Sequence, residues 1–147
     1  MKPIWDHDAY TEVVERIRRI SAERPTRWGK MNPPQILAHM ADQIRMGLGD
    51  IPSRRSSGVL SFWPMNYLAI HVVPWPHGAK GPQEAFTTRA TTWESDRQQL
   101  LDLIDRMRAK RDQSEWPEHS LFGKLSGHDW AALTYKHLTH HLKQLGV

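Results

Sequence analysis

Three histidines lie within five residues near the end of the chain, His137, His140 and His141, and their spacing is suited to metal chemistry. Residues 126–147 carry the apolar period of a helix, so His137 and His141 project from one face about one turn apart. Two imidazoles placed in this way can bind the same metal ion. His140 lies about 100° around the helix from His141. We therefore expect His140 to support the site or to form the rim of a pocket.

A third ligand must come from another element, and His39 is the best candidate. It lies beside the apolar stripe of a predicted helix over residues 32–49, so its ring can point inward. The other histidines lie near a terminus or in connectors: His7, His71, His77, His119 and His128. A structural alternative stays open, because histidines at a helix C-terminus can also stabilise the helix itself.

The elements that would position these residues are amphipathic helices. The apolar period predicts four of them, over residues 7–23, 32–49, 91–111 and 126–147. Asn32 and Ser126 are expected N-caps, Ser126 with Asp129 in a capping-box-like pattern, and Gly49 is the expected stop of the second helix. No segment shows the alternation of a strand, so we predict an all-α protein with one domain over residues 1–147.

Three other segments complete the prediction. Residues 59–73 are apolar on all sides and predict a buried helix. Residues 50–58 predict a mobile loop, as a lid or a simple connector. Residues 74–88 are rich in Pro and Gly and are expected to have little regular structure, so this long connection either is functional or wraps across the helices.

Composition narrows the chemistry. The chain has no cysteine, which excludes thiolate ligands and a cysteine nucleophile, so any metal must be held by nitrogen or oxygen. The net charge is +4, but Lys and Arg are mixed with Asp and Glu, so a nucleic-acid interface is the weakest of our hypotheses. Most of the seven tryptophans are expected in the core, and some in pocket walls. Without a secretory signal or a membrane span, we expect a cytoplasmic protein.

Two motifs, LAHMAD at 37–42 and KHLTHHLKQLG at 136–146, resemble the DinB-like (YfiT/DinB) superfamily of four-helix bundles. The segments PWPHGAKGPQEAF and SLFGKLSGHDWAALTYKHLTHHLKQLG further resemble a branch of small, uncharacterised bacterial domains. The resemblance implies an up-down-down-up bundle, a homodimer, and a zinc or nickel site. Its residues would be His39, His137 and His141, with Gln144 at a matching position.

The same resemblance implies a metal-dependent enzyme acting on a small molecule, either a thiol S-transferase or a hydrolase. A transferase would need a low-molecular-weight thiol as cosubstrate, because the chain supplies none. The alternative is a non-catalytic bundle protein of stress response that binds a small ligand or a metal. Asp42 and Gln144 are candidate acceptors for the ligating histidines. Glu84, Glu94 and His140 are conceivable general bases, and none of them is singled out.

Overall fold

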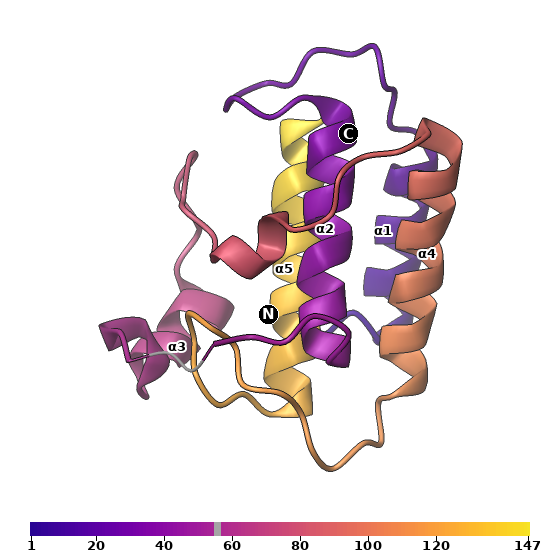
Figure 1. The fold of residues 1–147 in the computed structure, drawn as a ribbon. Coiled ribbons are helices and arrows are strands. Elements are labelled where there is room, and N and C mark those ends of the chain that lie inside the picture. Colours follow the sequence, from indigo (N-terminus) through magenta and orange to yellow (C-terminus); the bar gives the residue numbers. More distant parts are fainter. Residues whose placement is uncertain (55–56) are drawn as a thin grey trace.

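The computed structural model describes residues 1–54 and 57–147, and over these residues the chain is all-helical. Four longer helices lie side by side (Figure 1): α1 (His7–Arg18), α2 (Pro33–Leu48), α4 (Trp93–Ala109) and α5 (Gly127–Gln144). The other elements are short: η1 (Val59–Ser61), α3 (Met65–Tyr67), the π-helical η2 (Leu68–Val72) and η3 (Gln83–Phe86). No strand forms among the described residues, which agrees with the predicted fold class.

No described helix combines the length and apolar character needed to cross a bilayer. In the predicted 50–58 loop, Arg55 and Ser56 lie outside the described residues.

The predicted helix ends are confirmed where a side chain caps the backbone locally. Asn32 caps α2 in a capping box with Gln35, and Gly49 ends this helix in the left-handed conformation (φ 81°). Ser126 caps α5, and its N–H donates to the Asp129 carboxylate (3.1 Å). The first helix is shorter than predicted. It ends at Arg18, because the chain turns into a connection that is tied to the end of α5.

Each long helix packs against two of the others, so the four surround one apolar core. α2 contacts α4 and α5, and α1 contacts α5 and α4. The largest fully buried side chains of this core come from the N-terminal segment, α1, α2 and α4: Ile4, Ile17, Ile36, Leu37, Met40, Ile44, Leu100, Ile104 and Met107. α5 adds the buried Ala131, Leu138 and Leu142. A second cluster, around Trp130, Met46 and Phe122, lies under the connections.

α2 and α5 run antiparallel and meet in a regular register. His39 faces His137, Gln43 pairs with Thr134, and Gly47 lies against Trp130. Steps of about four residues on each helix keep these three pairs on the facing sides, since residues one turn apart share a face. A Cβ at Gly47 would lie 2.8 Å from the Trp130 ring, so glycine permits the close approach.

The prediction of a buried helix over 59–73 is wrong. The segment divides into η1, α3 and η2, which form a lobe at the side of the long helices (Figure 1), and Trp63 is 80% exposed. Pro64 lacks an N–H, so a continuous helix cannot form through it. The lobe is anchored instead by Lys136 of α5, whose Nζ donates to the carbonyls of Ala69 (2.7 Å) and Val73 (2.6 Å).

The 74–88 connection has little regular structure, as predicted, apart from the short turn η3. It crosses α2 before the chain enters α4 (Figure 1), and residues along it line a cavity beside α2 and α5. The connection therefore covers the region where the histidines lie.

Candidate metal centre

The structure brings His39, His137 and His141 together. His39 comes from α2 and the other two from α5, and one ligand nitrogen from each lies within 4.8 Å of the others. The Nε2 atoms of His39 and His137 are 3.0 Å apart. The ring centroids are 4.6–4.8 Å apart, with each pair of rings edge-on. All three side chains are buried, so the cluster lies inside the protein rather than on a helix surface.

Hydrogen bonds orient two of the three rings. The Nδ1–H of His39 donates to the Ala85 carbonyl at 2.7 Å. The Nδ1–H of His141 donates to Gln144 Oε1, also at 2.7 Å, and the Gln144 amide donates in turn to the Trp28 carbonyl. With the proton fixed on Nδ1, each ring has a lone pair on Nε2, which is the atom a metal requires. Gln144 thus occupies the supporting place that its spacing predicted.

Asp42 does not bond to His39, so its proposed role as a direct acceptor is wrong. Its carboxylate accepts instead from the backbone N–H of Thr87 (2.8 Å) and Thr88 (2.7 Å), and from Arg45 (2.9 Å). Burial raises the pKa of Asp42, but these bonds outweigh it and lower the pKa below its usual value. Asp42 therefore acts at a distance: it fixes the end of η3 against α2, beside the carbonyl that orients His39.

The environment keeps the three rings neutral. Burial lowers the pKa of His141 to about 3, and the neighbouring His39 adds to the effect. Burial, followed by the charges of His141 and His39, lowers the pKa of His137 well below its usual range. The pKa of His39 is also lowered, chiefly by burial. Neutral imidazole is the form that binds a metal.

The donor set fits a divalent cation. With their protons on Nδ1, His39 and His141 each have a lone pair on Nε2, and the Nε2 of His137 lies 3.0 Å from that of His39. Without a cation, this contact needs a proton on His137 Nε2. His137 Nδ1 is buried and has no partner among the described residues, so no protein group opposes moving that proton to Nδ1 when a cation binds Nε2. Three neutral nitrogens with no carboxylate are typical of a site that keeps the full charge of its ion and an open coordination position.

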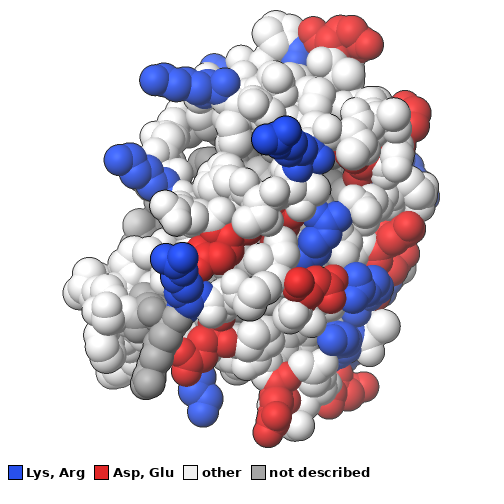
Figure 2. All heavy atoms as spheres, in the orientation of Figure 1, with Lys and Arg blue, Asp and Glu red and all other residues white. Residues whose placement is uncertain are grey.

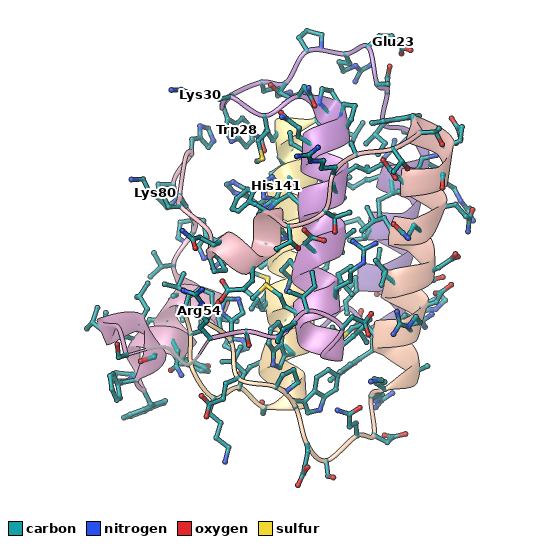
Figure 3. All side chains as sticks on the ribbon, in the orientation of Figure 1. Glu23, Trp28, Lys30, Arg54, Lys80 and His141 are labelled. Carbon is teal, nitrogen blue, oxygen red and sulfur yellow. The ribbon has the colours of Figure 1, made fainter. Side chains whose placement is uncertain are left out.

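A cavity of about 350 Å³ opens beside the three histidines. Its walls are mainly apolar: Met31, Met46, Leu60, Ala69, Trp75, Ala85, Phe86, Leu121, Phe122 and Leu133. His140 forms part of the rim, as expected, with its ring against Trp28 and Trp75. Figure 3 shows His141 on α5, with the connection that carries Trp28 above it and the one that carries Lys80 to its left. A small molecule in this cavity would reach the histidines.

The three candidate general bases differ in whether they border the cavity. Glu84 accepts from the Arg54 backbone N–H (3.1 Å), and Glu94 is exposed on α4 beside Arg97. Neither lines the cavity, and no Asp or Glu does so within the described part of the chain. Of the three candidates, only His140 borders the space where a substrate would lie.

Sequence reasoning missed three polar residues of the cavity, Gln43, Lys80 and His119. Gln43 lies one turn after His39 on α2, so the four-residue spacing was a usable signal. His119 was set aside as a connector residue, but it is buried and lines the cavity. Its Nδ1 accepts from the backbone N–H of Leu121 and Phe122, an arrangement that no pattern in the sequence indicated.

A second histidine cluster lies where the lobe meets α5. His71 donates to Asp129 (2.8 Å) and stacks on Tyr67 and His128, and His71, His128 and Asp129 could together offer three metal ligands. Asp129 already accepts from Ser126 in the capping box, and His128 is exposed. This cluster is explained by its structural role, because it joins η2 to the start of α5.

The fold and the site thus define an all-helical protein with a buried group of three histidines beside an apolar cavity. Residues 5–146 match the family described as "Protein of unknown function (DUF1569)", and the chain belongs to that family. No curated protein and no solved structure matches the chain significantly.

Proposed function

We propose that the chain is a single DinB-like domain over residues 1–147, an up-down-down-up four-helix bundle whose His39, His137 and His141 hold a divalent metal ion, zinc or nickel. The observation that carries this proposal is the convergence of three buried, neutral imidazoles from two helices. The fixed tautomers of His39 and His141 support it, because both rings direct an unprotonated nitrogen toward the same space.

The function that this site supports best is a metal-dependent thiol S-transferase acting on a small molecule. A divalent ion held by His39, His137 and His141 would lower the pKa of a thiol or water bound to it. The chain has no cysteine, so the thiol is a low-molecular-weight cosubstrate. Its sulfur forms a bond to a carbon of the second substrate, the bond to the leaving group breaks, and the thiol proton passes to His140 at the rim.

The structure supports hydrolysis less well than thiol transfer. Activated water benefits from a positioned general base, which is usually a carboxylate or a histidine. No Asp or Glu is among the described cavity-lining residues, so of the three candidate bases only His140 borders the cavity. A thiolate is already a strong nucleophile, so a transferase depends less on such a base.

The lack of a carboxylate base also favours a second candidate, a non-catalytic protein of stress response that binds a metal or a small ligand. The apolar cavity is suited to binding with or without chemistry. Assays with a panel of thiol–electrophile pairs and a panel of esters and amides separate the candidates. Turnover that is lost in His137→Ala supports the enzyme, whereas ligand binding without turnover across both panels supports the binding protein.

Metal analysis of protein purified without a histidine tag tests the centre itself. We expect about one zinc or nickel ion per chain, and loss of that ion in His39→Ala. His7→Ala is the matched control, because His7 is exposed and remote from the cluster. Absence of bound metal, together with no thermal shift on adding zinc or nickel, would refute the proposal.

We also propose a homodimer formed through the lobe of residues 59–73. The lobe exposes Val59, Phe62 and Trp63, and residues 57–76 contain no Lys, Arg, Asp or Glu. Exposed apolar surface of this kind is typical of protein interfaces. Light scattering should report a dimer that Trp63→Ser weakens, and a wild-type monomer at high concentration would contradict it.

The charge distribution supports a small-molecule partner over a nucleic acid, and we keep the expected cytoplasmic location as part of the proposal. On the face in Figure 2, acidic and basic side chains are interspersed. A nucleic-acid interface would instead gather Lys and Arg on one side and would show affinity that falls steeply with salt.

A further inference from the structure

Gln43 is a buried polar side chain that the protein leaves partly unsatisfied. It is 3% exposed, and it lies in the wall of the cavity beside the histidines. Its Nε2 donates to Thr134 Oγ1 at a long 3.4 Å, while its Oε1 has no partner in the part of the chain that the structure describes. Rotating the amide by half a turn would only exchange which end is unpaired, so one polar atom remains unmatched.

An unmatched buried amide destabilises the fold, because it loses its bonds to water without replacing them. Leu or Met would fill the same position on α2 at no such cost, since the neighbouring wall residues Met46 and Leu133 are apolar. The packing of the cavity wall therefore does not explain why a glutamine occupies position 43. A group of this kind in a cavity wall is expected where a ligand supplies the missing bond.

The position of Gln43 relative to the histidines sets the length of that ligand. Gln43 follows His39 by one turn on α2, and Thr134 precedes His137 by about one turn on α5. Residues at this spacing have Cβ atoms about 5–6 Å apart. A small molecule can thus contact the histidines at one end and the amide of Gln43 at the other.

We propose that Gln43 determines ligand specificity through a hydrogen bond between the unmatched end of its amide and a neutral hydroxyl or amide group of the bound molecule, a group that can both donate and accept. The apolar body of this molecule lies against the cavity wall. Lys80 is the one described Lys or Arg of the lining, so an anion would pair there rather than at Gln43, and no described Asp or Glu in the lining would pair with a cation. The inference rests on the proposed metal centre only for the direction in which the ligand lies, so it can be tested without metal.

The test compares two probes of nearly equal shape, benzyl alcohol and ethylbenzene, by ligand-observed NMR on metal-free protein. The ratio of their dissociation constants isolates the hydroxyl group. Because a net hydrogen bond corresponds to about a three- to tenfold change in affinity, the preference for the alcohol should fall by that factor in Gln43→Leu and in Gln43→Met. Gln98→Leu, the same change on α4 outside this cavity, should leave the ratio unchanged.

Thermal unfolding supplies the second readout. Both Gln43 variants should unfold at or above the wild-type temperature, because they remove an unmatched polar group. If the ratio of the two dissociation constants is unchanged in both variants, the proposal is overturned. The unmatched end of the Gln43 amide would then bond only to water. Failure of the wild type to bind either probe, or a lowered unfolding temperature with an unchanged ratio, would also overturn the proposal.

The zinc titration is measured separately on the same samples. If the wild type takes up no zinc, the proposed metal centre fails while the result for Gln43 stands. If zinc binds normally and the probe ratio does not respond to Gln43, the specificity role fails and the metal centre stands.

Discussion

Acid should destabilise this protein through His119, a buried histidine outside the proposed metal centre. Its Nδ1 accepts from the backbone N–H of Leu121 (3.0 Å) and Phe122 (3.2 Å), so its proton lies on Nε2. Burial lowers the pKa of His119 to about 4, although the charge of Glu84 acts in the opposite direction. The folded protein therefore keeps this ring neutral at pH values where the unfolded chain takes up a proton.

The magnitude follows from the two pKa values. In the unfolded chain the pKa of a histidine is about 6.5. A proton bound by one state alone changes the free energy of unfolding by about 1.4 kcal/mol per pH unit. Between 6.5 and about 4 the contribution of His119 is therefore about 3 kcal/mol. The protein therefore loses stability as the pH falls from 6.5 to about 4, and His119 causes no further loss below that pH.

The substitution His119→Asn isolates this contribution, because the Asn carboxamide oxygen can accept the same two backbone bonds without titrating. Urea unfolding would be measured from about pH 7.5 down to about pH 4. Relative to wild type, the variant should gain about 3 kcal/mol over this range, whatever its stability at neutral pH. His7→Asn is the control, since His7 is exposed. Parallel pH curves for His119→Asn and wild type would refute the reasoning.

Three further substitutions test the contacts around the site and the packing of the helices. Gln144→Leu removes the acceptor of His141 Nδ1–H and should weaken zinc binding about 10–100-fold by calorimetry. Gly47→Ala places a methyl group 2.8 Å from the Trp130 ring. The steric clash should lower the free energy of unfolding by about 1–3 kcal/mol, which exceeds the gain of about 1 kcal/mol in helix propensity. Denaturant unfolding measures the difference, and an increase in stability would contradict the prediction. Ser126→Ala should cost about 1 kcal/mol by the same assay, whereas Ser126→Asn should retain the cap.

The parts of the fold that the sequence could predict are those decided by near neighbours. Asn32, Gly49 and Ser126 act within four residues of themselves, so their capping roles could be recognised without knowing the tertiary structure. The shared face of His137 and His141 is equally local. The position of His39 beside these two residues is not a local property, because it depends on how α2 and α5 align. Its prediction relied on an inward position and on a family resemblance.

The segment 59–73 shows why hydrophobicity alone did not locate the core. An apolar run on all sides predicts burial, yet among the larger side chains of η1, α3 and η2 only Ile70 is fully buried. The space between the four long helices is already filled by their own side chains. Whether a further apolar segment finds room depends on the volume left by the others, which is a property of the whole fold rather than of the segment.

The antiparallel register of α2 and α5 places the close packing at Gly47, the amide of Gln43 and the histidine cluster along one contact. At Gly47 the helices approach closely enough for Trp130 to fill the space where a side chain would stand. One turn along α2 the helices present an amide to the cavity, and a further turn along they present His39 to His137. Close packing at one end fixes the distance at the other, because the two helices are rigid over these turns. A bulkier residue at position 47 should therefore weaken zinc binding as well as stability, although it touches none of the three histidines.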